Sequence, residues 1–136
     1  MRFWKFITIV CLIAVNAGQE RLERFYSTVS AESHLKQNKE CRMCWLRRSE
    51  LSNLDLKHAD LEAAELSGTD LNATNLENAN MRSVRMRRAD LTTVVSLRGA
   101  DLSNADLLES NVHDHVLNSA ILCDTILPNG RLSGCN

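Results

Sequence analysis

Four cysteines that are able to support redox or metal chemistry stand in two pairs. Cys41 and Cys44 form a CxxC segment, and Cys123 and Cys135 lie near the C-terminus. A CxxC segment is typical of thiol–disulfide oxidoreductases when it begins a helix in a βαβ setting, while paired cysteines also form zinc sites and structural disulfides. Which chemistry applies depends on how far apart the fold places the two pairs.

Two other clusters offer different chemistry. His113, Asp114 and His115 form an HDH triplet, whose imidazoles and carboxylate are common transition-metal ligands. The segment Met81–Arg88 is basic enough to suggest contact with an anion or a nucleic acid, and its arginines are Arg82, Arg85, Arg87 and Arg88. The chain has no phosphate-binding loop, dinucleotide fingerprint, nucleophile elbow or zinc-protease motif. We therefore predict that it is not an enzyme and assign it no catalytic residue and no cofactor.

The first residues have the order of a secretory signal peptide. A basic start is followed by the apolar run Phe6–Val15 and by the small residue Ala17. The run is only half of the ~20 residues that span a bilayer, so we expect residues 1–17 to be a cleaved signal peptide. No stable membrane span is expected after cleavage. Cleavage would remove Cys11 and leave four cysteines, an even number, in a secreted or periplasmic chain.

Length and charge are those of an ordinary globular domain. The chain has 136 residues, of which 24% are charged and 44% hydrophobic. Loss of Arg2 and Lys5 from its 16 basic residues would leave 14 against 17 acidic residues, a formal charge of -3. Such a mildly acidic chain is not expected to bind nucleic acid.

An apolar residue returns every five positions. Eighteen such centres run from Leu46 to Leu132, fifteen of them Leu, and the linker Thr92–Ser96 inserts one extra residue. Small residues such as Ala59 and Val95 stand two positions before most centres, and Asp or Asn often stands directly before them, giving the consensus A-(D/N)-L-x-x. A helix cannot use this period, because each five-residue step advances about 500° and scatters the centres around every face.

These tandem units resemble the pentapeptide-repeat family over residues 44–133. The resemblance implies an all-β fold, a right-handed quadrilateral β-helix with four pentapeptides to a coil. Large centres and small residues would point inward and fill a narrow bore, while backbone groups pair with the coils above and below. Residues 20 apart, or 21 across the insertion, should then stack. Two inner columns are predicted: Ala59, Ala79, Ala100 and Ala120, and Leu61, Met81, Leu102 and Leu122.

A solenoid exposes its core at both ends and requires caps. Residues 18–43 lack the repeat and are expected to form an N-terminal cap with a short helix around residues 31–37. Residues 134–136 would form a C-terminal tail. These boundaries complete a four-part organisation of signal, cap, solenoid and tail.

The coil fold also decides between the readings of the cysteines. Coils about 4.8 Å apart would separate the two pairs by about 20 Å, whereas a disulfide needs Cα atoms within about 7 Å. Local disulfides are therefore expected, Cys41 with Cys44 and Cys123 with Cys135, and a zinc site built from all four is excluded. Thiol redox chemistry at the CxxC segment stays an alternative, although no βαβ setting supports it.

Stacking gives the basic segment another interpretation. Arg85 falls between Glu65 and Asp106, and Arg82 lies above Glu62. Ion pairs on the surface are therefore favoured over an anion or nucleic-acid site.

The same register separates the two histidines of the HDH triplet. His113 is expected to point outward and His115 inward, so that a shared metal ion is disfavoured. An inward imidazole requires a hydrogen-bond partner, and His115 is predicted to be a buried structural histidine beneath the C-terminal tail.

Three apolar residues depart from the polar exterior in the last coil. Val116, Ile121 and Ile126 occupy the outward position in which Asp or Asn is usual. Either the C-terminal tail covers them, or they form an interface with a protein partner or with a second copy of the chain.

The function favoured by these features is that of an exported, non-catalytic solenoid that acts as a structural or protein-binding module. A second function follows from the resemblance, because some members of the family mimic DNA and modulate type II topoisomerases. Thiol–disulfide exchange at the CxxC segment is the third.

Overall fold

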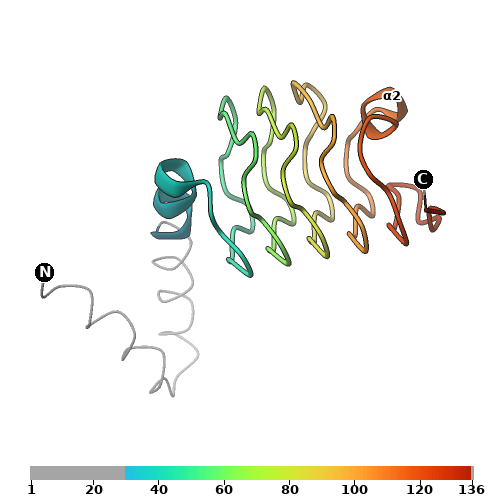
Figure 1. Cartoon of the computed structure of the whole chain (residues 1–136), viewed down its shortest axis with the longest axis horizontal. Helices are drawn as coiled ribbons and strands as arrows, with labels where there is room; N and C mark the ends of the chain where they lie inside the picture. The colour runs from blue at the N-terminus through green and yellow to red at the C-terminus, as the bar shows by residue number, and fades with distance from the viewer. Residues whose placement is uncertain (1–29, 136) are drawn as a thin grey trace, which may run out of the picture.

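Residues 30–135 are described by the computed structural model, so that the predicted signal peptide and the first part of the predicted cap lie outside the described residues. The chain winds into a row of stacked coils (Figure 1). Parallel bridges join residues 20 apart as far as Asp70 with Asp90, residues 21 apart across the insertion, and residues 20 apart again up to Asp106 with Ile126. The predicted stacking register is confirmed.

Each coil has four sides. Bridge residues recur every five positions, and a partner lies four pentapeptides away. The bridges are isolated, so that the coil is built from very short extended sides and not from long strands. The predicted inner columns are buried to within 4% exposure, apart from Leu122, which is partly buried against the same core. Burial of these Leu and Met side chains, at about 1.5–3 kcal/mol each, is the main stabilising contribution.

Most corners are β-turns. The amide of the third residue after a centre donates to the carbonyl of that centre, as Ala64 does to Leu61 at 3.0 Å. The residue directly before the donor has a positive φ, which is 56° at Ala63. Most corners place a non-glycine residue in this left-handed conformation, which costs an L-residue about 1–2 kcal/mol. The corner therefore does not in itself select glycine.

The Asp or Asn before each centre has a structural role. Its side-chain oxygen accepts a hydrogen bond from the amide two residues later, as Asp70 does from Asn72 at 2.9 Å and Asn75 from Glu77 at 3.0 Å. This local bond satisfies an amide that faces away from the ladder. The regular row of carboxylates thus fixes the corners.

The inserted residue is Val95, and the prediction that it points inward is wrong. Its side chain is 62% exposed, whereas Val94 is 8% exposed and occupies the small inner position. The amide of Val94 makes the usual corner bond to the Leu91 carbonyl, so that the extra residue is extruded after the corner. Ser96 resumes the ladder opposite Asn75, which makes the insertion a one-residue bulge.

One side of the last full coil is a helix that the five-residue period did not predict. Helix α2, Asp114–Leu117, projects from the stack (Figure 1). His115 falls at a position where other repeats have a small inward residue, and the prediction that it is buried is wrong, because it is exposed. An imidazole is too large for that position, and the chain turns into a helix that keeps the residue count of the coil.

The C-terminal end reverses direction after Leu127. The amide of Gly130 donates to the Leu127 carbonyl, and Ile126 pairs with Leu132 in an antiparallel bridge. Leu132 was expected to be the last inward centre, but its side chain is 64% exposed, so that prediction is wrong. The turn around Pro128 sends the tail back along the last coil and prevents another inward repeat.

The N-terminal end begins one pentapeptide earlier than expected. Cys41 takes the place of a centre with 2% exposure, and its amide bonds to the Asp60 carbonyl of the next coil. Residues 30–38 are helical and bury Leu35 completely against the core. Among the described residues, no helix is both long and apolar enough to cross a membrane.

Candidate functional site

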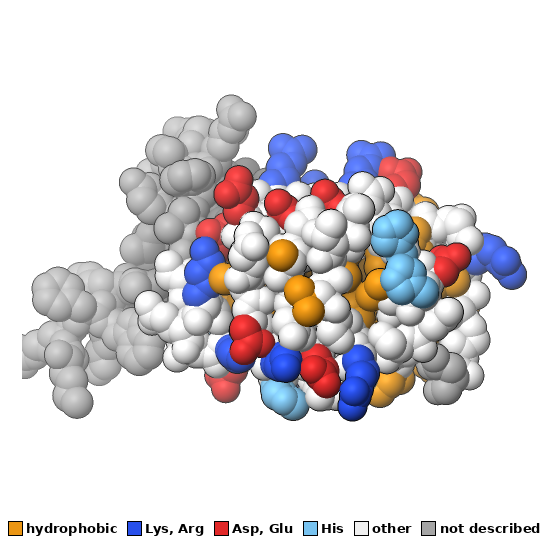
Figure 2. All heavy atoms as spheres, turned by 90° about the horizontal axis from the view of Figure 1, so that it is seen from above, with side chains coloured by type: hydrophobic (Ala, Val, Ile, Leu, Met, Phe, Trp, Pro, Cys, Tyr) orange, Lys and Arg blue, Asp and Glu red, His pale blue; other side chains and the backbone are white. Residues whose placement is uncertain are grey.

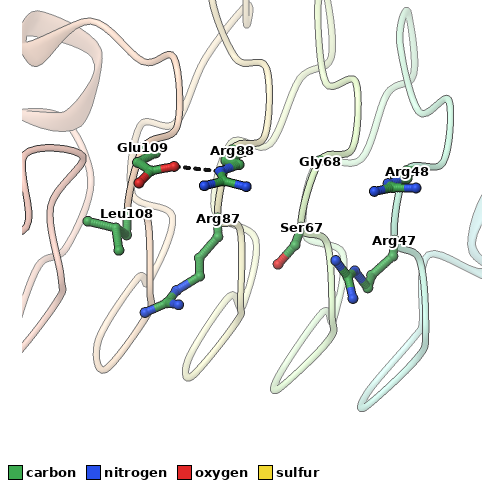
Figure 3. Close-up of a pocket in the computed structure, with 8 residues that line it drawn as sticks. All are labelled: Arg47, Arg48, Ser67, Gly68, Arg87, Arg88, Leu108 and Glu109. Carbon is green, nitrogen blue, oxygen red and sulfur yellow. Dashed lines mark hydrogen bonds and ion pairs between the residues drawn. The ribbon is translucent and has the colours of Figure 1, made fainter.

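An open groove of about 300 Å³ crosses four successive coils on one corner of the rod (Figure 3). We call it the arginine groove. Arg47 and Arg48 form one wall, Arg87 and Arg88 the other, and Ser67 and Gly68 lie between them (Figure 3). The groove is lined by Arg47, Arg48, Ser67, Gly68, Arg87, Arg88, Leu108 and Glu109.

Coil stacking creates this groove from residues that are distant in sequence. The amide of Arg48 donates to the Ser67 carbonyl at 3.1 Å, and that of Gly68 to the Arg87 carbonyl at 2.8 Å. Three equivalent corners are thereby fixed in a row, at about 4.8 Å per coil. The two pairs of arginines stand two coils apart, and the middle corner carries the smallest side chains.

Gly68 leaves the groove open. Its φ is +69°, but the equivalent corners at Arg48 and Arg88 have nearly the same conformation with full side chains. A Cβ atom at Gly68 would lie 3.4 Å from Cγ of Arg48. The absence of a side chain at Gly68 therefore leaves space beside Arg48.

The two walls differ in charge compensation. Arg88 forms an ion pair with Glu109 (Figure 3), and Arg87 Nε lies 2.6 Å from Asp106 Oδ2. Arg47 lies over the Trp45 ring at 5.8 Å from its centroid, and neither it nor Arg48 forms an ion pair within the described part of the chain. Between residues 40 and 100, the other six arginines are all paired: Arg42, Arg82, Arg85, Arg87, Arg88 and Arg98.

Ion pairing of the basic segment agrees in kind with the stacking prediction. Arg85 pairs with Glu65 at 3.9 Å, whereas Arg82 pairs with Asp101 at 3.1 Å and not with Glu62. Figure 2 shows blue and red side chains side by side along the edges of the rod. The sequence reading missed the groove because Arg47 and Arg48 lie 40 residues from Arg87 and Arg88. The register itself was the signal, since it places 47 and 87 in one column.

Both cysteine pairs are disulfides in the structure. Cys41 and Cys44 have their Cα atoms 5.3 Å apart, and Cys123 and Cys135 have theirs 3.9 Å apart. The first disulfide occupies two inward positions at the N-terminal end of the bore, while the second lies at the surface and ties the tail to the last coil. Asp124 lies near the sulfur atoms of the second pair.

The HDH triplet does not divide into an inner and an outer histidine. His113 and His115 are both exposed, and their rings stack with centroids 5.5 Å apart. Asp114 begins α2 between them. The arrangement assigns neither imidazole a structural role in the core.

The three apolar residues of the last coil are only partly accessible. Ile121 stacks on Asp101 and is 45% exposed, whereas Ile126 is half-buried beside Leu132. Val116 lies in α2 and packs partly against the core, so that its predicted place on the outward ladder is wrong. The exposed apolar surface at this end is formed chiefly by Ile121 and Leu132.

Comparison with protein-family models matches residues 59–94 to pentapeptide repeats, in eight copies. Residues 59–94 are therefore pentapeptide repeats. Among solved structures the chain is similar to HetL, a pentapeptide repeat protein involved in heterocyst differentiation regulation from the cyanobacterium Nostoc sp. strain PCC 7120, with 29% identity and a TM-score of 0.36. The match covers 69% of this chain and 51% of HetL, so that this chain spans about half the length of that protein. No curated protein matches it.

Two carboxylates of the coils accept hydrogen bonds that stabilise their ionised form. The hydroxyl and the amide of Thr92 both donate to Asp90 and lower the pKa of that carboxyl. Burial acts to raise the pKa of Asp101, but bonds from Ser103 and Arg82 outweigh it and leave the pKa lowered. Both groups therefore remain charged at neutral pH, as acceptors that hold corners in place.

Proposed function

We propose that this chain is a non-catalytic pentapeptide-repeat scaffold, a structural or protein-binding module. The supporting observation is the fixed register, which aligns solvent-facing side chains 20 residues apart into columns. Such columns present a surface whose spacing is set by the backbone. In keeping with the family, the coil would be right-handed, and the helix over residues 30–38 would cap its N-terminal end.

The proposed protein contact lies at the C-terminal end. Ile121 and Leu132 are exposed there, Ile126 pairs with Leu132, and Ile126 and Val116 are half-buried. An apolar patch with a polar surround is suited to burial against another protein. A second copy of the chain, forming a homodimer through the last coil, is the simplest such partner.

We further propose that the protein is exported to a secreted or periplasmic location. Two disulfides in a small chain are typical of an oxidising compartment. The signal-like residues 1–17 agree with this, and their cleavage would place the mature N-terminus at Gly18.

Two alternative functions receive less support. A DNA-mimic modulator of a topoisomerase requires a continuous acidic surface, whereas acidic side chains here alternate with paired arginines and one corner carries the arginine groove. Thiol–disulfide exchange requires an accessible sulfur, and Cys41 is 2% exposed.

Site-specific photocrosslinking in the exporting cell tests the protein-binding proposal. A photoreactive amino acid placed at Ile121 should yield a crosslinked product of defined mass, equal to twice the chain mass for a homodimer. The same group at Arg98, which is exposed on another part of the rod, is the control. Equal crosslinking at both positions, or none at Ile121, would contradict an interface at the C-terminal end.

A further inference from the structure

We propose that the arginine groove binds a tetrahedral oxyanion, a phosphate or sulfate group. This site is separate from the proposed protein contact, because the groove spans the corners at 47–48, 67–68, 87–88 and 108–109, whereas the contact lies at Ile121 and Leu132. The failure of either proposal therefore leaves the other intact.

The charge of the groove carries the first step. Its lining includes four arginines and a single carboxylate, Glu109. Arg47 and Arg48 lack the acidic partner that every other arginine between residues 40 and 100 has in the described chain. Two guanidinium groups without acidic partners on adjacent residues repel, and an anion bound in the groove would relieve that repulsion.

The geometry of the walls selects the class of anion. The two arginine pairs stand on either side of the small Ser67–Gly68 corner, two coil spacings or about 10 Å apart, and those of the second side are ion-paired with Asp106 and Glu109. A guanidinium donates two parallel hydrogen bonds to oxyanions, and guanidinium groups that reach one anion from adjacent or stacked corners require acceptor oxygens that point in different directions. A tetrahedral phosphate or sulfate provides these, whereas a carboxylate has two oxygens in one plane.

Two polar groups complete the arrangement. The Ser67 hydroxyl lies between the walls and is half-buried, in position to donate to a bound oxyanion (Figure 3). Glu109 closes the far end and holds Arg88 in an ion pair. A bound anion competes with Glu109 for Arg88. Neutralisation of Glu109 should therefore strengthen anion binding.

Titration of the full, disulfide-bonded chain with inorganic phosphate tests the proposal by NMR at low ionic strength. The amide signals of Ser67 and Gly68 should shift saturably, while that of Gly99, a glycine with the same φ of +69° at another corner, should not. Sulfate should act in the same way and acetate should not saturate. Glucose 6-phosphate distinguishes an esterified phosphate from the free ion. If it binds as tightly as inorganic phosphate or more tightly, the site is assigned to an esterified phosphate. If inorganic phosphate binds more tightly, the site is assigned to the free ion.

Charge-matched variants provide the decisive comparison. Arg48→Gln should weaken phosphate binding by about tenfold, as loss of a charge-assisted hydrogen bond does, whereas Arg98→Gln removes the same charge elsewhere and should leave binding nearly unchanged. Glu109→Gln should tighten binding by about two- to fivefold. Equal weakening by Arg48→Gln and Arg98→Gln, or shifts of Ser67 and Gly68 that do not saturate, would overturn the proposal.

Discussion

The middle coils and the C-terminal end of this rod follow the same five-residue period but differ in how fully they use it. Between Leu61 and Leu107 every centre is at most 1% exposed, and each small inward position is filled by Ala, Thr or Val. Beyond Asn111 the centres Val112, Leu122 and Leu127 are only partly buried. Their small inward residues, Ser110, Ala120 and Thr125, are still buried, so the difference lies at the large centres, which no further regular coil covers at this end.

His115 marks the point at which the two regions diverge. It replaces the small residue of its repeat, and the chain forms α2 there in place of a side of the coil. Asp101 still pairs with Ile121, so that the register is regained within one pentapeptide. The fold therefore tolerates one irregular side when the chain returns to the ladder in the next pentapeptide.

The largest expected difference between the two regions is in the cost of removing a centre. Leu76→Ala removes a completely buried side chain and should lower the free energy of unfolding by about 2–5 kcal/mol. Leu132→Ala, at a centre that is 64% exposed, should change it by no more than about 0.5 kcal/mol. Urea unfolding followed by circular dichroism measures both, and similar losses would mean that the two regions are packed alike.

The second prediction concerns the tail that closes the C-terminal end. The double variant Cys123→Ser, Cys135→Ser opens a loop with a sequence separation of 12 and should lower the free energy of unfolding by about 3 kcal/mol. Hydrogen exchange should then increase first near Ile126 and Leu132, with the middle coils still protected. If protection falls uniformly instead, the tail is not a separate local element.

Buried hydroxyls allow a finer comparison along the inner columns. Thr74 donates its hydroxyl to the Leu51 carbonyl at 2.5 Å, so that Thr74→Val should destabilise the fold by about 1–2 kcal/mol. Ser110 lies near the end of the regular coils, and its buried Oγ makes no hydrogen bond in the described structure. Ser110→Ala should therefore be neutral or slightly stabilising, and thermal melting of both variants checks the contrast. A clear loss for Ser110→Ala would reveal a bond at that hydroxyl.

The smallest effect expected is on pH dependence. The pKa of Asp90 is lower in the folded chain because Thr92 donates to its carboxylate, so that its contribution to stability is present above the ordinary carboxyl pKa and is lost as pH falls through the folded value. Acidification should lower the urea concentration at the unfolding midpoint less in Asp90→Asn than in the unchanged chain. Near neutral pH, the dependence of that midpoint on pH should be nearly the same in both. An unchanged acid limb would show that Asp90 contributes nothing to the linkage.

Much of the fold was predictable because the period of five defines the repeat, the family resemblance implies four repeats to a coil, and the coil length fixes which residues meet. The 20-residue register and the inner columns of Ala59 and Leu61 follow from this. The extra residue was placed in the correct linker, Thr92–Ser96, but a pattern of apolar residues cannot distinguish Val94 from Val95. The reversal after Leu127 was missed because Leu132 keeps the period although its backbone turns back.

The site was less predictable than the fold. The cysteine pairs followed from distance along the rod, whereas the arginine groove depends on what is absent between its walls. Gly68 and Ser67 contribute there through their small size, and the five-residue period does not predict where small outward residues leave a groove. Only the stacked structure shows that Arg47 and Arg48 line one groove with Arg87 and Arg88.

The stacking register underlies both the coil and the arginine groove, and nuclear Overhauser contacts between backbone protons test it most directly. Contacts should join residue 60 with 80, 80 with 101, and 101 with 121, the offset growing by one across Val95 and then returning to 20. Contacts at another offset, or the short-range pattern of a helix through residues 59–107, would contradict the four-sided coil.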